Sequence, residues 1–132
     1  MDIQVSIEQG KSQTVAVMKV RGEINAENFV EVVNKARELY NNPARNLILD
    51  LGEVPAISSA GLVAIHKIAL IYSGVPHKVE EDENPDFTHS SNARKYVRLL
   101  NPQGEVKKAL EDAKLTLFFK IFGDLKEALQ SF

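Results

Sequence analysis

The feature of this sequence that most constrains its fold is the alternation of short apolar runs with longer segments of helical periodicity. Strand-like runs lie at 3–8, 14–20, 46–51, 97–100 and 115–122. Helical spacing of apolar residues marks the segments 25–40, 58–72 and 104–114, and a short segment after Asp124. The order of elements is therefore β-β-α-β-α-β-α-β-α. It predicts an α/β fold with a mixed β-sheet of four to five strands and about four helices.

Residues with strong preferences for helix ends mark several boundaries. We expect Asn25 to cap the first helix, because an Asn side chain accepts hydrogen bonds from unpaired first-turn amides. Asp124, with Glu127 three residues later, forms a capping-box pattern that opens the terminal helix. These signals support the alternating order of elements.

The segment 77–96 differs from the rest of the chain. It is polar, acidic at first and basic later, and it has almost no periodic apolar signal. We expect a single domain over 1–132 with a flexible insertion at 77–96. The residues His77, Asp82, Asp86 and His89 lack tight ligand spacing, so they indicate a solvated loop and no metal site.

Composition excludes several functional classes. The net charge of −2 gives no general attraction to nucleic acid or anionic membranes. Cysteine is absent, which excludes disulfides and a cysteine nucleophile and suits the reducing cytoplasm, where we expect the protein. No apolar run reaches the roughly 20 residues that span a bilayer, and the N-terminus lacks an apolar signal region. Phosphate-cradling glycine loops, zinc patterns and nucleophile elbows do not occur, so we expect neither an enzyme nor a cofactor.

One stretch carries a more specific signal. The residues Asn46 to Ile65, NLILDLGEVPAISSAGLVAI, join an apolar strand ending in Asp-Leu to a short loop and a Ser-Ser-Ala-Gly-Leu helix start. This stretch resembles the STAS domain, which is shared by bacterial anti-sigma factor antagonists and the cytoplasmic tails of sulphate transporters. Gly22-Glu23-Ile24 is similar to the family's exit from the second strand, and the order of elements also matches. The resemblance implies a STAS-like fold.

In the antagonist branch, the resemblance implies a serine in this turn that an ATP-binding anti-sigma factor of the GHKL type phosphorylates. Alignment of Gly61-Leu62 with the family's Gly-Leu places the acceptor at Ser59. Ser58 stands where relatives often carry Asp, and it is the alternative acceptor. The implied partners are this serine kinase and a resetting serine phosphatase, and we expect a monomer or a weak homodimer. The partner-binding residues are Asp50, Ser58, Ser59, Ala60, Gly61, Leu62 and Asn25.

The physics of such a switch can be stated independently of the resemblance. A helix N-terminus offers unpaired N–H groups, so a phosphate attached there is tolerated locally. The same phosphate adds about −1.5 to −2 charges to any surface that docks a partner. In the purely structural alternative, Ser58 and Ser59 only cap the helix. Asp50 either anchors its loop, which we favour, or helps position a metal bound to a partner's nucleotide.

Two other functions stay open at this level. The domain could be a constitutive STAS interaction module in a larger signalling or transport complex, without phosphorylation. The missing Asp at position 58 and the segment 77–96 both favour this alternative. An enzyme or small-ligand carrier has no support from any catalytic constellation in the sequence. Fold resemblance alone does not decide between these functions.

Overall fold

The computed structural model describes residues 1–40, 46–72, 96–117 and 119–132. The insertion expected at 77–96 therefore lies outside the described residues, except for the exposed Tyr96 at its end. Within the described residues, the order of elements follows the predicted alternation of strands and helices.

The core of the fold is a mixed five-stranded sheet in the order β1-β2-β3-β4-β5. Strand β1 (Asp2–Gln9) is antiparallel to β2 (Thr14–Arg21), with which it forms a hairpin. Strands β3 (Asn46–Glu53), β4 (Val97–Leu100) and β5 (Lys120–Phe122) continue the sheet in parallel with β2. The predicted mixed α/β sheet is confirmed.

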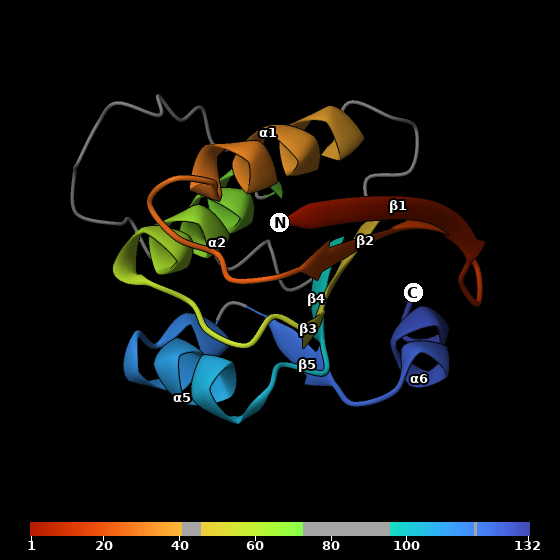
Figure 1. The fold of residues 1–132 in the computed structure, drawn as a ribbon. Helices are drawn as coiled ribbons and strands as arrows, with labels where there is room; N and C mark the ends of the chain where they lie inside the picture. Colours follow the sequence, from red (N-terminus) through yellow and green to blue (C-terminus); the bar gives the residue numbers. More distant parts are fainter. Residues whose placement is uncertain (41–45, 73–95, 118) are drawn as a thin grey trace.

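Helices cover both faces of this sheet (Figure 1). The helices α1 (Phe29–Tyr40) and α2 (Ser59–Tyr72) pack against each other on one face, which α5 (Gly104–Asp112) also covers. The short α6 (Leu125–Gln130) lies on the opposite face. The helices α1, α2 and α5 are the crossovers between successive parallel strands and cover one face, whereas α6 follows the last strand and covers the other.

The alternation of side chains along β2 explains why there are two apolar clusters. Ala16 and Met18 belong to the larger cluster with α1, α2 and α5, whereas Val15 and Val17 belong to the smaller cluster with α6. Successive strand residues point to opposite faces, so one strand serves both clusters. The run 46–49 of β3 is buried throughout, as a central parallel strand requires.

Helix α6 is fastened to the sheet at its C-terminal end. The guanidinium of the buried Arg98 lies 4.3 Å from the ring centroid of Phe132, and its Nε donates to the Oγ of Ser131 at 3.0 Å. A cation over an aromatic face and a charge-assisted hydrogen bond both stabilise this contact. The Asp124 side chain caps the other end by accepting from the Glu127 N–H, which confirms the predicted cap.

One predicted strand is wrong in its first half. The run 115–122 was expected to be a continuous strand, but Leu115–Leu117 forms a 3₁₀ turn and only Lys120–Phe122 pairs with β4. Leu115 and Phe119 are both buried in the larger cluster, and residues four apart share one face in a helical turn as well as in a strand, so the apolar pattern alone does not separate the two. Only three residues of β4 pair with the last strand, which limits its length.

Strand β1 also departs from the predicted half-buried pattern. Ile3 packs against the larger cluster, but Val5 and Ile7 are 38% and 57% exposed. The cause is position, because β1 is an edge strand and the helices on this face pack over the inner strands. The apolar side of β1 is therefore only partly covered.

Candidate functional site: the turn before α2

The loop between β3 and α2 is held by the backbone of the segment that leaves β2. Ile24 and Ile57 form a parallel bridge, and the Ser58 N–H donates to the Ile24 carbonyl at 3.0 Å. The Gly22 N–H donates to the Glu53 carbonyl at 3.0 Å. These bonds extend the pairing of β2 and β3 into the loop and fix the position at which α2 begins.

Ser58 is the N-cap of α2. Its Oγ accepts from the Gly61 N–H at 3.3 Å, and its carbonyl accepts from the Leu62 N–H at 2.9 Å. The side chain is half-buried, and the helix begins at the next residue. This is the geometry expected of a serine cap, in which the side-chain oxygen binds an otherwise unpaired first-turn amide.

Ser59 lies on the first turn of α2 and is exposed. Val63, one turn further along the same face, is 46% exposed. Ala60 and Leu62 are half-buried, and Leu62 packs against the larger apolar cluster. The start of α2 therefore presents a hydroxyl next to an uncovered apolar side chain.

Gly61 is required by close packing and not by backbone conformation. A Cβ added here would lie 2.5 Å from Cγ1 of Ile57 and 2.8 Å from the carbonyl oxygen of Ile24. Neither distance is compatible with a side chain. The absence of a Cβ lets the helix start lie directly on the loop that leaves β2. The Gly in the Ser-Ala-Gly-Leu pattern thus has a structural cause in its contact with this loop.

Asn25 follows directly on Ile24 and begins the turn that leads into α1. Its Oδ1 accepts from the Glu27 N–H at 2.9 Å, and the Asn28 Oδ1 accepts from the Asn25 N–H at 2.9 Å. This reciprocal pair resembles a capping box with Asn in the third position, but it closes a turn and not the helix itself. The cap predicted at Asn25 is therefore placed too early, because α1 begins only at Phe29. Because Ile24 bonds to Ser58, the backbone of Asn25 lies beside the turn.

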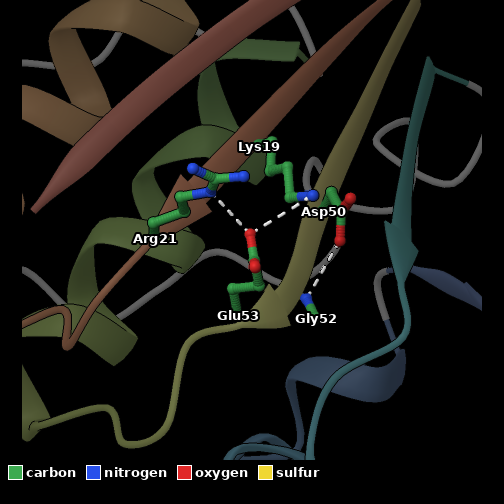
Figure 2. Close-up of polar contacts among 5 residues, drawn as sticks. All are labelled: Lys19, Arg21, Asp50, Gly52 and Glu53. Atoms are coloured by element: carbon green, nitrogen blue, oxygen red, sulfur yellow. Dashed lines mark hydrogen bonds and ion pairs between the residues drawn. The ribbon is translucent and has the colours of Figure 1, made fainter.

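Asp50 anchors its own loop. Its Oδ1 accepts from the Gly52 N–H at 2.9 Å, as Figure 2 shows. The side chain is half-buried near the carboxyl end of β3. The carboxylate is thus engaged two residues along the chain, which agrees with the favoured loop-anchoring role.

A charged cluster, absent from the sequence-based predictions, lies at the carboxyl ends of β2 and β3 (Figure 2). The Glu53 carboxylate accepts from Arg21 Nε at 2.7 Å and lies 3.2 Å from Lys19 Nζ. The hydrogen bond from Arg21, and then that from Lys19, lowers the pKa of the Glu53 carboxyl below its usual range. All three side chains are partly or largely exposed. Exposed ion pairs contribute little to stability, so the main effect of this cluster is on the local surface charge. In the sequence, Lys19 and Arg21 alternate on one face of the second strand, but their pairing with Glu53 depends on the register between β2 and β3.

Neither a metal site nor a membrane span is found in the described part of the chain. Over residues 1–40, 46–72, 96–117 and 119–132, no three His, Cys, Asp or Glu side chains are grouped so that they could hold a metal ion. None of the helices in these ranges has the length and apolar character needed to cross a membrane. The residues His77, Asp82, Asp86 and His89 lie outside the described ranges.

The fold and this turn together define a small α/β domain with a serine-bearing helix start at the carboxyl edge of its mixed sheet. The STAS domain model matches residues 6–72, which include the second half of β1, all of β2, the turn and all of α2. The chain belongs to the STAS domain family. The resemblance seen in the sequence is thereby confirmed.

Solved structures share this fold at low sequence identity. A candidate anti-sigma factor antagonist from Thermotoga maritima is 20% identical, with a TM-score of 0.67 over 94% of this chain and 90% of that one. An anti-sigma factor antagonist from Mycobacterium paratuberculosis is 18% identical, with a TM-score of 0.65 over 97% and 92%. The unphosphorylated anti-sigma factor antagonist SpoIIAA is 13% identical, with a TM-score of 0.58 over 96% and 92%. A search of curated proteins gave no match.

Proposed function

We propose that this chain is a cytoplasmic regulatory protein of the anti-sigma factor antagonist kind. It binds a GHKL-type anti-sigma factor with serine kinase activity through the surface around Ser58, Ser59, Ala60, Gly61 and Leu62, and phosphorylation at Ser59 switches it off. The observation that carries the proposal is the difference in environment between the two serines. Ser58 is engaged as the helix cap, while Ser59 is exposed on the first turn.

The geometry favours Ser59 over Ser58 as the phosphate acceptor. A kinase must bring the hydroxyl to the γ-phosphate of ATP in line, which requires an accessible side chain. Ser59 is exposed, whereas Ser58 is half-buried and its Oγ accepts from the Gly61 N–H. Modification of Ser58 would disturb this cap.

A phosphate on Ser59 would affect partner binding because of the surface that surrounds it. Val63 is 46% exposed one turn beyond Ser59 and supplies an apolar contact that a partner would bury. A phosphate on Ser59 places about two negative charges at the edge of that contact, where they would have to be desolvated. A loss of about 3 kcal/mol would weaken binding roughly 100-fold.

The comparisons support the partner class without defining the partner. Two of the similar structures are named anti-sigma factor antagonists, and one of these is described in its unphosphorylated form. On this basis we propose that the cognate kinase restrains a sigma factor, that the unmodified domain releases it, and that a serine phosphatase resets the phosphorylated form. The domain itself is proposed to bind and not to catalyse.

The direct test is phosphorylation by the GHKL-type kinase encoded in the same genome, with ATP and Mg²⁺, followed by mass spectrometry. We expect one phosphate on the wild type and on Ser58→Ala, and none on Ser59→Ala. Titration calorimetry should then show that Ser59→Asp weakens kinase binding at least 10-fold. Gln103→Asp is the matched control, because it places the same charge at the start of α5. A phosphate on Ser58, or unaltered binding by Ser59→Asp, would contradict the proposal.

The second candidate is a constitutive STAS interaction module that is never phosphorylated. It is favoured by the serine at position 58, where relatives often carry Asp beside the acceptor, and by the polar segment 77–96 in the sequence. In that case Ser59→Asp and wild type bind the partner equally, while Val63→Asp still abolishes binding. The pair of variants therefore separates a switch from a fixed docking surface.

A further inference from the structure

The two edges of the sheet are protected very differently. The edge strand β5 has only three residues and begins with Lys120. The opposite edge strand, β1, has eight residues and pairs with β2 in an uninterrupted register. It contains no proline, glycine, lysine or bulge. Natural proteins use such devices, and charged side chains, to prevent edge-to-edge pairing, and β1 carries only Asp2 and Glu8 near its two ends.

The outer edge of β1 offers both hydrogen-bonding groups and apolar side chains. In an antiparallel pair, alternate residues direct their N–H and C=O groups away from the partner strand. Among the described residues, no strand pairs with this side of β1. Val5 and Ile7 point to the same face and are 38% and 57% exposed. Figure 1 shows β1 at the margin of the sheet, with α1 on that face.

We propose that β1 pairs antiparallel with β1 of a second copy of this chain, so that the two sheets form one continuous sheet. The two-fold axis passes beside Ser6. Each Val5 then lies opposite Ile7 of the other copy, and each Gln4 lies opposite Glu8 of the other copy.

Symmetry, charge and the positions of the two exposed apolar residues together favour this register. A two-fold axis perpendicular to the sheet pairs residues that point to the same face. The axis must therefore pass between a residue and the same residue of the second copy. An axis at Val5 would place Asp2 opposite Glu8 twice, and like charges directly opposite each other are destabilising. An axis at Ser6 avoids this clash, lets the Gln4 amide donate to the Glu8 carboxylate, and joins the two exposed apolar residues.

The assembly leaves both copies in the same orientation relative to the sheet. In one copy, α1 and α2 lie on the same face of the sheet (Figure 1). Because the axis is perpendicular to the sheet, the helices α1 and α2 of the second copy lie on that same side. This proposal does not depend on the switch at Ser59, since β1 and α2 are separate elements.

Disulfide trapping tests both the assembly and its register, because the chain has no cysteine of its own. Ser6 is exposed, so Ser6→Cys preserves the fold and places two thiols on directly opposed residues about 5 Å apart between Cβ atoms. Mild oxidation is expected to link most of the Ser6→Cys protein into a dimer. The control Gln4→Cys is also exposed, but its two thiols would lie about 13 Å apart along the strands, and it should remain monomeric. Faster linkage of Val5→Cys than of Ser6→Cys would overturn the register.

Sedimentation equilibrium of the wild-type chain from about 10 μM to 1 mM supplies the second measurement. We expect a reversible dimer whose dissociation constant rises at least 10-fold in Ile7→Lys, with an unchanged circular dichroism spectrum. A wild-type chain that is monomeric at 1 mM and unlinked as Ser6→Cys would overturn the assembly, and would leave this edge to a strand of a different protein.

Discussion

The starts of α2 and α6 use the same capping chemistry in opposite surroundings. Ser58 Oγ accepts from the N–H three residues on at 3.3 Å, and Asp124 Oδ2 does the same at 3.4 Å. At α2 the cap is half-buried, and a Cβ on Gly61 would collide with the loop that leaves β2. At α6 the cap is exposed, and a Cβ on Gly123 would meet nothing within 4 Å. A cap signal thus locates a helix start but does not say whether that start is packed.

The largest expected effect comes from filling the close contact at α2. Gly61→Ala places a methyl group against Ile57 and the Ile24 carbonyl. Overpacking of this kind costs about 1–3 kcal/mol, part of which the better helix propensity of alanine offsets. We expect the free energy of unfolding in urea to fall by about 2 kcal/mol. Gly123→Ala is the matched control and should change it by less than about 0.5 kcal/mol. Equal losses of stability in Gly61→Ala and Gly123→Ala would contradict the contrast between a packed and an unpacked helix start.

Removal of the cap at α2 is expected to cost less. Ser58→Ala leaves the Gly61 N–H without its side-chain acceptor in a half-buried position. Loss of an N-cap typically lowers the free energy of unfolding by about 1 kcal/mol, within a range of about 0.5–2 kcal/mol. Because the Gly61 amide that loses its acceptor is partly buried, we expect a loss in the upper half of this range. Ser58→Thr keeps the acceptor and serves as the control in the same urea titration. A stability of Ser58→Ala equal to that of wild type would show that the hydroxyl has no capping role.

The same deletion at α6 should have a smaller and more local effect. Asp124→Ala removes an exposed cap, so water can replace the carboxylate as acceptor for the Glu127 N–H. We expect about 0.5 kcal/mol. Hydrogen exchange is the sharper measurement, because protection should fall in 125–130 and remain unchanged in α2. A global loss of protection would mean that this helix start supports the whole core.

The smallest effect is expected at Ser59. Its side chain is exposed on the first turn of α2, so Ser59→Ala should change the free energy of unfolding by less than about 0.5 kcal/mol. Thermal unfolding of Ser59→Ala beside Ser58→Ala measures the difference directly. A loss above about 1 kcal/mol would show that Ser59 has a structural role, and would weaken its assignment as the modified residue.

Much of the fold could be predicted because its signals are local. The strand and helix order follows from apolar periodicity, and Asp124 with Glu127 indicated a helix start that the structure confirms. The prediction of a strand over 115–122 was wrong because apolar residues in succession suit either a strand or a turn, and among the described residues of this run only Lys120–Phe122 finds a pairing partner in β4. The exposure of Val5 depends on which strand lies at the edge, which periodicity does not encode.

The candidate site also has some features that the sequence could predict and others that it could not. The roles of Ser58 as cap and of Asp50 as loop anchor depend on neighbours two or three residues away, so sequence reasoning could reach them. The need for glycine at position 61 depends on Ile24, which belongs to a different part of the chain. The pairing of Glu53 with Arg21 likewise depends on the register between β2 and β3. Tertiary contacts of this kind become visible only with the structure.

The bridge between Ile24 and Ile57 has a consequence for the kinetics of recognition. The Ser58 amide is hydrogen-bonded into an extension of the sheet, so the first turn of α2 is held in place before any partner arrives. A surface prepared in this way needs no slow rearrangement, and its association rate should lie in the ordinary range of roughly 10⁵–10⁷ M⁻¹s⁻¹. A charge added at Ser59 would then act on the contact itself and not through a conformational change of the turn.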